Sequence, residues 1–219
     1  PMRARVDAAL TLDAREVPAK VVERLCRLLS FPNPAFLDRL RLGFNPGAEP
    51  ETVCFVEQAG GEVRLPRGAI HVLRRAAAQE GLIVACEDAR VLPDVKLEVP
   101  ALGLRDYQQV AVDRLAKITQ GTVVIPCGGG KTRVGMGAIA RLRTPTLILV
   151  HTLDLAEQWL GELKDRLGLD AGLIGDGEER PAPVTVAVIQ ALVRWEPSKL
   201  DAFLGGFGLL ILDEAHHVA

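Results

Sequence analysis

The chain has 219 residues, 48% of them hydrophobic and 25% charged, which fits one large or two modest globular domains and excludes a disordered chain. Its formal net charge is −2. Residues 1–100 contain 14 basic and 14 acidic residues, and residues 101–219 contain 12 basic and 14 acidic residues. Nucleic-acid binding through a large net positive charge is therefore excluded, and any such binding would require a local groove. No apolar run reaches the roughly 18 residues of a membrane helix, and the N-terminus lacks the apolar core of a secretory signal, so we expect a cytoplasmic protein, or a nuclear one in a eukaryote.

The first hundred residues predict a small α+β domain. Pro32 and Pro34 end the first helical pattern, because proline cannot continue a helix. Gly60-Gly61 lies between two strand-like segments and is typical of a β-hairpin turn. The expected elements are helices over residues 18–30, 35–42 and 68–80, and strands over residues 52–57, 62–65 and 82–86. Residues 92–103 contain prolines and are interpreted as the linker to the next domain.

From about residue 105, short apolar runs alternate with helical patterns. Continuous apolar runs are typical of parallel strands that are buried on both faces, and their alternation with helices implies a parallel α/β sheet. The expected strands are Thr122–Ile125, Thr146–Val150, Val184–Val188 and Leu209–Leu212, and the expected helices are Tyr107–Thr119, Lys131–Leu142 and Leu153–Leu167. The first of these helices has Val110, Ala111, Leu115 and Ile118 on one side. We therefore predict an α/β fold in residues 101–219, preceded by the α+β domain of residues 1–100.

The four cysteines are far apart in the sequence and form no CxxC pair, which argues against a zinc site. Disulfides are also rare in a reducing compartment. Cys26, Cys54 and Cys86 are therefore expected to be buried thiols, the usual state of a free cysteine.

Residues 122–142 are predicted to form a strand, a glycine-rich turn and a helix, the context that a phosphate-binding loop requires. Consecutive glycines let the backbone N–H groups point inward without side-chain obstruction, and the following helix presents its positive end to a phosphate. Lys131 would add a charge for the β- and γ-phosphates, and Thr132 would offer its hydroxyl to Mg²⁺. The nucleotide-binding residues of the loop are then Cys127, Gly128, Gly129, Gly130, Lys131 and Thr132. The alternative is a glycine turn that merely starts a helix, and Cys127 is interpreted as a small loop residue rather than a nucleophile.

An acidic pair follows the last predicted strand. Asp213 and Glu214 would stand at the carboxyl end of a parallel strand, where ligands bind in open α/β sheets. We expect Asp213 to hold Mg²⁺ and Glu214 to orient the attacking water as a catalytic residue together with Lys131. Taken alone the pair could be a solvated strand end, but the loop and the pair support each other. Of the two histidines that follow, His216 is expected to have a coupling role and His217 a surface or packing role.

Five segments occur in the order in which helicases carry them. They are LRDYQ at 104–108, IPCGGGKT at 125–132, LVHTLDLAEQW at 149–159, TVAVIQAL at 185–192 and LDEAHH at 212–217. Together they resemble the first RecA-like motor domain of superfamily 2 DNA helicases, and the first two look most like the XPB-type branch, which is associated with DNA repair. The resemblance implies ATP and Mg²⁺ as cofactors, single-stranded or duplex DNA as a partner, and a DEAH box at Asp213–His216.

The resemblance also implies contacts for polar residues of these segments. Arg105 and Gln108 would lie near the adenine, with an exposed helical turn as the alternative. Thr152 and Gln158 would lie near the groove that tracks a DNA strand, with a helix cap and a solvated helix face as the alternatives.

In the fourth segment, Thr185 and Gln190 would touch the nucleic-acid backbone, with ordinary polar residues of a strand and a turn as the alternative.

The resemblance places a small DNA-contacting α+β domain before the motor, and residues 1–100 occupy that position. A second RecA-like domain would supply an arginine finger and close over the nucleotide. The chain ends at Ala219, so we expect a part of a longer helicase that binds nucleotide weakly, turns over negligibly and does not unwind DNA alone. The alternatives are another phosphate-loop enzyme, such as a kinase or metabolic ATPase, and a non-catalytic module in which residues 1–100 bind DNA or a partner.

Overall fold

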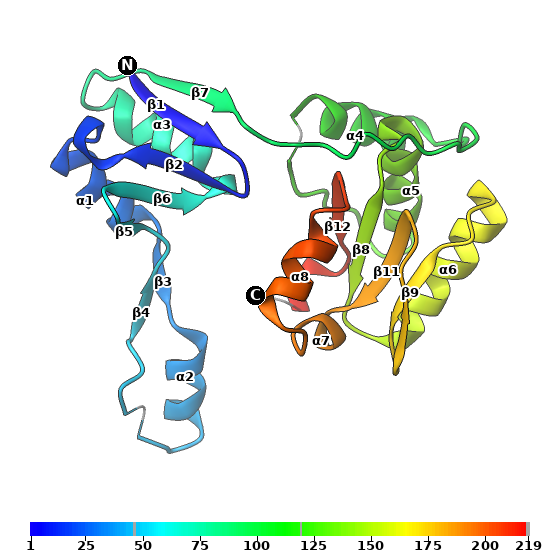
Figure 1. The fold of residues 1–219 in the computed structure, drawn as a ribbon. Coiled ribbons are helices and arrows are strands. Elements are labelled where there is room, and N and C mark those ends of the chain that lie inside the picture. The colour runs from blue at the N-terminus through cyan, green and yellow to red at the C-terminus, as the bar shows by residue number, and fades with distance from the viewer. Residues whose placement is uncertain (46, 119, 218–219) are drawn as a thin grey trace. The chain divides into compact units, whose positions relative to one another are not determined.

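The structure, a computed structural model, describes residues 1–45, 47–118 and 120–217. The chain forms two compact units, Pro1–Val91 and Leu92–Ala219 (Figure 1). This division falls before the boundary predicted at residue 100, because Leu97 and Val99 are buried in the core of the second unit. The Leu97 N–H also donates a hydrogen bond to the carbonyl of Arg143, with 2.9 Å between N and O. Residues 92–103, interpreted as a linker, are therefore a packed part of the second unit.

The first unit contains a five-stranded sheet in the order β5-β6-β2-β1-β7, with α1 and α3 packed against one face (Figure 1). Its strands are β1 Met2–Val6, β2 Ala9–Asp13, β5 Glu57–Ala59, β6 Glu62–Pro66 and β7 Val84–Asp88, and its helices are α1 Ala19–Leu28 and α3 Ile70–Ala78. Alternate residues of β1, β2 and β6 are buried, as expected for a sheet with one covered face. The predicted hairpin turn is present, since Gly60-Gly61 joins β5 to β6 with φ of +60° and +81°, but its first strand is Glu57–Ala59 rather than the predicted residues 52–57. β1 and β2 are strands that the sequence pattern did not predict.

A two-stranded antiparallel sheet extends from this unit (Figure 1). It pairs β3 Ser30–Pro32 with β4 Thr52–Cys54, and α2 Pro34–Arg41 lies between them in the chain. Cys54 is exposed because it lies on this thin sheet, and Cys86 is exposed on the edge strand β7. The prediction of buried thiols is therefore wrong for both residues, whereas Cys26 is half-buried.

The second unit is a sheet with helices on both faces, in the order β10-β9-β11-β8-β12 (Figure 1). Its strands are β8 Thr146–Val150, β9 Gly172–Gly175, β10 Glu178–Arg180, β11 Val184–Val188 and β12 Leu209–Leu212, and its helices are α4 Asp106–Ile118, α5 Lys131–Leu142, α6 Leu153–Leu167, α7 Ile189–Leu192 and α8 Pro197–Leu204. All neighbouring strands run parallel except the edge strand β10. One core cluster joins α5 and α6 to the sheet, and a second includes Leu192 of α7 and Phe203 of α8. The predicted α/β fold is confirmed, with β8, β11, β12, α5 and α6 at the predicted bounds; Thr119, the predicted end of the first helix, lies outside the described residues.

The strand predicted over Thr122–Ile125 does not form. These residues belong to no ladder of the described structure, and the side chain of Val124 is 90% exposed. An extended segment becomes a strand only where a neighbouring backbone supplies hydrogen bonds, and β12 pairs with β8 rather than with this run.

None of the helices in the described part of the chain is both long and apolar enough to span a bilayer.

Candidate active site

The carboxyl ends of the parallel strands meet at one edge of the second unit's sheet. Thr152 comes soon after β8, Gln190 follows β11 and Asp213 follows β12. Lys131, the first residue of α5, forms an ion pair with Glu214 at this edge. The glycine-rich loop and the acidic pair therefore meet in space, although Lys131 and Glu214 are 83 positions apart. Ligands of open α/β sheets bind at this edge.

The loop before α5 has a backbone shape that favours glycine. Gly128 and Gly130 have φ of +76° and +80°, in the left-handed region that other residues rarely adopt. A Cβ on Gly129 would overlap Cγ2 of Ile125, and a Cβ on Gly130 would lie 2.6 Å from Nε2 of Gln108. Around Gly128 the corresponding space is open. These glycines keep side chains out of the turn that precedes the positive end of α5.

Two side chains of α4, Tyr107 and Gln108, are hydrogen-bonded to the backbone of the loop. Gln108 is only 1% exposed, and its Nε2 donates a hydrogen bond to the carbonyl of Gly129 at 3.1 Å. Its Oε1 accepts the N–H of Arg105 at 3.0 Å. The hydroxyl of Tyr107 donates to the same Gly129 carbonyl at 2.7 Å. Tyr107 was not predicted as a site residue, although the LRDYQ segment contains it. The side chain of Arg105 is exposed.

The acidic pair has a defined orientation. Oδ1 of Asp213 accepts the backbone N–H of Glu214 at 2.9 Å, and Oδ2 accepts the indole N–H of Trp159 at 2.8 Å. Glu214 has φ of +48°, an uncommon backbone conformation for a non-glycine residue that recurs at functional sites. Its Oε1 contacts the Lys131 ammonium and its Oε2 lies 3.3 Å from Nδ1 of His216. Trp159 is a second residue that was not predicted for the site, although it ends the third motif segment.

The electrostatics of the site suit a magnesium-bound polyphosphate. The hydrogen bond with Glu214 raises the pKa of Lys131 above its ordinary value, and the charge of Asp213 adds to this effect, so the ammonium persists at neutral pH. Thr132 and Asp213 supply the hard oxygen donors that Mg²⁺ prefers, and Cys127 is exposed in the loop. Within the described residues, no group of three or more His, Cys, Asp or Glu side chains could hold a metal ion.

Three residues expected near DNA are exposed on the second unit. Thr152 precedes α6, and its hydroxyl accepts the N–H of Leu155 at 3.3 Å, so it acts as the helix cap. Gln158 is exposed on α6, and Gln190 is exposed at the carboxyl end of β11. These side chains therefore have accessible surface.

Thr185 does not. It is 0% exposed near the amino end of β11, the opposite edge from the acidic pair. Its hydroxyl accepts the N–H of Ala182 at 2.9 Å and donates to the Ala182 carbonyl at 2.7 Å. The structure thus gives Thr185 the alternative role of a polar strand residue, while the side chain of His217 lies outside what the structure describes.

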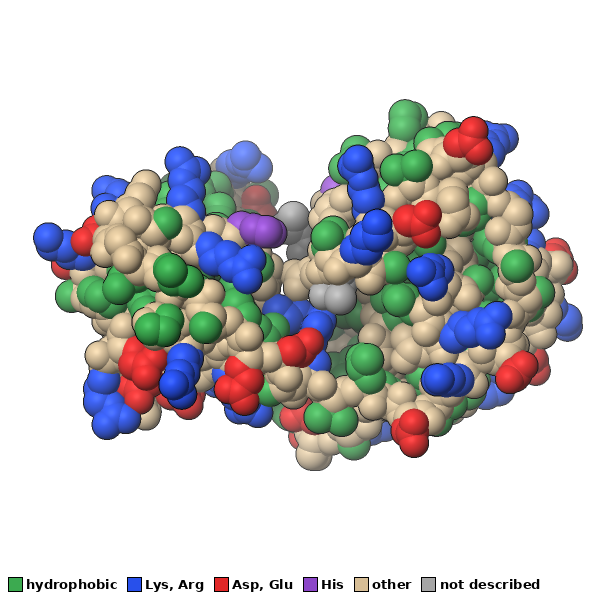
Figure 2. All heavy atoms as spheres, turned by 90° about the horizontal axis from the view of Figure 1, so that it is seen from above, with side chains coloured by type: hydrophobic (Ala, Val, Ile, Leu, Met, Phe, Trp, Pro, Cys, Tyr) green, Lys and Arg blue, Asp and Glu red, His purple; other side chains and the backbone are tan. Residues whose placement is uncertain are grey.

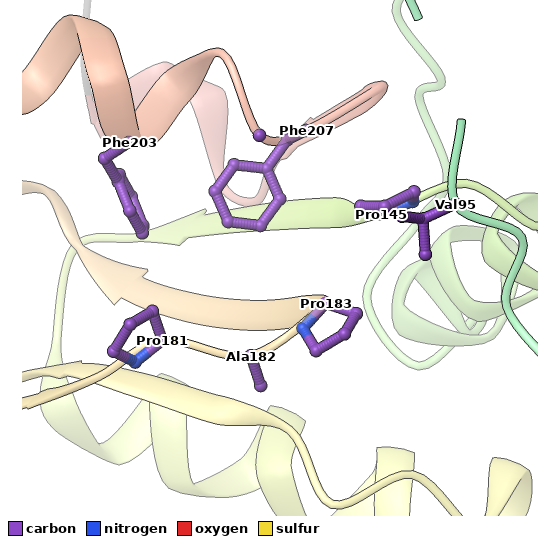
Figure 3. Close-up of a pocket in the computed structure, with 8 residues that line it drawn as sticks. Val95, Pro145, Pro181, Ala182, Pro183, Phe203 and Phe207 are labelled. Atoms are coloured by element: carbon purple, nitrogen blue, oxygen red, sulfur yellow. The ribbon is translucent and has the colours of Figure 1, made fainter. Parts of the chain in front are cut away.

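A separate pocket of about 320 Å³ opens at the amino edge of the same sheet (Figure 3). It is lined by Val95, Pro145, Pro181, Ala182, Pro183, Phe203, Gly206 and Phe207. Pro145 and Pro183 stand directly before β8 and β11, at the ends of these strands away from the glycine-rich loop. Its apolar lining does not suit a phosphate, so we do not assign the nucleotide to it.

Charged side chains of both signs are interspersed over the face of each unit seen in Figure 2. This distribution agrees with the formal net charge of −2. A DNA contact on this face would therefore depend on local geometry rather than on a broad basic patch.

The family match to known proteins lies within the second unit. Residues 101–219 match the sequence profile of the ResIII family, described as "Type III restriction enzyme, res subunit". A Sulfurisphaera tokodaii protein named DNA 3'-5' translocase XPB2 is 36% identical over 115 residues, which cover 52% of this chain and 25% of that protein. The DNA 3'-5' helicase XPB of Mycobacterium tuberculosis is 42% identical over 120 residues, covering 52% of this chain and 22% of that protein. The subunit XPB of the general transcription and DNA repair factor IIH of Danio rerio is 28% identical over 145 residues, covering 58% and 18%.

The chain thus spans no more than a quarter of the length of these relatives. The family profile nevertheless covers more than half of the chain, and the glycine-rich loop and the acidic pair lie within the match. The chain therefore belongs to the ResIII family, and its second unit, which has a RecA-like α/β fold, is similar to a part of the XPB-type helicases.

Proposed function

We propose that this chain binds Mg-ATP and DNA as the first motor domain of a DNA helicase or translocase, and that rapid hydrolysis requires a second RecA-like domain. The observation that carries the proposal is the contact between Lys131 and Glu214, which joins two motifs 83 positions apart. This contact brings together a cation, a glycine turn, a helix N-terminus and two carboxylates. A Mg-triphosphate requires this set of groups.

Each group has a role in this proposal. The backbone N–H groups of the glycine-rich loop bind phosphate oxygens, and Lys131 exchanges Glu214 for the β- and γ-phosphates. Thr132 and Asp213 hold Mg²⁺, which neutralises phosphate charge when bound. Glu214, once released from Lys131, orients the attacking water. His216 lies beside the Glu214 carboxylate, a position suited to coupling nucleotide state to nucleic-acid binding.

The two residues predicted to lie near the adenine, Arg105 just before α4 and Gln108 within it, have different proposed roles. Both ends of the Gln108 amide are engaged, by Gly129 and by the Arg105 N–H, so we assign Gln108 to fixing the loop. The side chain of Arg105 is exposed, and its Nη1 donates a hydrogen bond to the Tyr107 hydroxyl at 3.3 Å, a contact that it would exchange for the base. This arrangement would link recognition of the adenine to the shape of the phosphate loop.

DNA as the partner is supported by the names of the relatives, which are DNA helicases or translocases. Exposed Thr152, Gln158 and Gln190 are the proposed contacts on the second unit, and buried Thr185 is left out. The first unit is proposed as the accessory domain that binds DNA.

A titration with a fluorescent ATP analogue tests the site. Lys131→Ala removes a charge-assisted contact of roughly 1.5–3 kcal/mol, which corresponds to a loss of about tenfold or more in affinity. Lys164→Ala is the matched control, because Lys164 is exposed in the last turn of α6 and its removal should leave the affinity unchanged. Unchanged binding by Lys131→Ala would refute the assignment of the loop.

Turnover is tested with the same chain, with and without single-stranded and duplex DNA. We expect nucleotide binding, DNA binding and negligible hydrolysis. Rapid DNA-stimulated hydrolysis by the 219-residue chain would contradict the requirement for a second RecA-like domain. Failure to bind either DNA would contradict the DNA part of the proposal.

A further inference from the structure

Trp159 makes a direct contact with the proposed metal ligand. Its indole Nε1–H donates a hydrogen bond to Oδ2 of Asp213 at 2.8 Å, across 54 positions of sequence. Trp159 is only 2% exposed, so little water can replace this donor. Hydrogen bonds between a buried donor and a charged acceptor are stronger than those between neutral groups.

The same ring packs against the helix that follows the phosphate loop. A Cβ added to Gly135 of α5 would lie 2.7 Å from Cη2 of Trp159 and 3.6 Å from Cδ1 of Ile211. Gly135 therefore leaves room for the indole, and Ile211 of β12 borders the same space. One side chain of α6 thus touches both α5, which begins at Lys131, and the carboxylate at the end of β12.

The two hydrogen bonds on Asp213 fix its carboxylate plane. Trp159 binds Oδ2 and the Glu214 N–H binds Oδ1, so rotation of the carboxylate would break both bonds. Each carboxylate oxygen keeps further acceptor capacity for a metal ion or for metal-bound water. The indole is a neutral donor that does not titrate, so it orients the carboxylate and leaves its negative charge in place. A lysine or arginine in the same position would neutralise that charge.

We propose that Trp159 is a positioning residue, which holds the Asp213 carboxylate for Mg²⁺ and ties its orientation to the packing of α5. This inference rests on the proposed function, because it assigns the metal to Asp213. It predicts a defect in the response to Mg²⁺ rather than in the binding of the nucleotide itself. Partners that orient metal ligands typically change metal affinity about 10–100-fold when they are removed.

Trp159→Phe tests the inference, because phenylalanine keeps an aromatic ring and removes the donor. In the 219-residue chain we expect unchanged affinity for the ATP analogue without Mg²⁺ and at least about a tenfold rise in the Mg²⁺ concentration needed for half of the Mg-dependent binding. Trp195→Phe is the matched control, because Trp195 packs against Phe203 of the other core cluster. An unchanged Mg²⁺ requirement in Trp159→Phe overturns the inference.

A spectroscopic measurement keeps the inference testable if Trp159→Phe does not fold. Trp195→Phe leaves Trp159 as the one tryptophan of the chain. Its emission should change when Mg²⁺ is added to the nucleotide complex, and this change should disappear on further substitution of Asp213→Asn. No change on adding Mg²⁺ would overturn the inference while nucleotide binding persists. Absence of nucleotide binding by the unsubstituted chain would instead refute the proposed function.

Discussion

Gly130→Ala should destabilise the second unit through two separable effects. Gly130 has φ of +80°, and this left-handed conformation costs another residue roughly 1–2 kcal/mol. The added Cβ would also lie 2.6 Å from Nε2 of Gln108. The buried amide must then move and lose its bond to Gly129, which costs about 1–3 kcal/mol. The free energy of unfolding should therefore fall by about 2–5 kcal/mol.

Urea unfolding followed by tryptophan fluorescence measures this loss, because both tryptophans, Trp159 and Trp195, belong to the second unit. Gly128→Ala is the control, since Gly128 has φ of +76° but no atom within 4 Å of an added Cβ. It should show the backbone cost of roughly 1–2 kcal/mol alone. Combining Gly130→Ala with Gln108→Ala should cost less than the sum of the single changes, because the clash is gone. Equal losses for the two glycine variants, or strict additivity of the pair, would refute the reasoning.

Three further predictions concern other parts of the chain. Gly161→Ala should raise the free energy of unfolding by up to about 1 kcal/mol. Gly161 lies within α6, and an added Cβ would meet no atom within 4 Å. A thermal midpoint that is unchanged or lower would contradict this prediction. Thr185→Val should lower stability by about 1–2 kcal/mol by leaving Ala182 without its side-chain partner, yet leave DNA affinity unchanged; weaker DNA binding at unchanged stability would restore the nucleic-acid role. The hydrogen bond from Arg15 lowers the pKa of Asp13 from 3.8 to about 2, so its contribution to stability is present above pH 3.8 and is lost as the pH falls towards 2. NMR titration should find this midpoint and its return towards 3.8 in Arg15→Ala, and a midpoint near 3.8 in the unsubstituted chain would contradict the pairing.

Prediction of the fold succeeded where a sequence pattern and its surroundings agree. β8 and β11 are continuous apolar runs, and helices cover both of their faces. Thr122–Ile125 has a similar composition but pairs with no strand of the described residues, so its preference for extended backbone is not realised in a sheet. In α4, Val110 and Ile118 are 52% and 58% exposed whereas Gln108 is buried, because the loop carbonyl satisfies its polar amide. A periodicity argument assigns apolar residues to the inner face and cannot anticipate such a partner.

The candidate site divides in the same way. The glycine-rich loop and the acidic pair are short contiguous motifs, so local spacing was enough to predict that the loop precedes α5 and that the pair follows β12. The hydrogen bonds of Tyr107 and Trp159 join residues 22 and 54 positions apart, and no local spacing encodes them. Thr185 was assigned to the nucleic acid from its motif, but its place near the amino end of a strand buried on both faces became visible only in the fold.

The position of β12 at the margin of the sheet has a consequence for handling the protein. In the described part of the chain, β12 is paired along one side only, and Leu210 and Leu212 are 57% and 39% exposed. An apolar strand with free N–H and C=O groups is a template for pairing with another chain. At high concentration, this 219-residue chain should therefore self-associate through hydrogen bonds between backbones. Added salt should not dissociate these assemblies, because the contacts are not ion pairs.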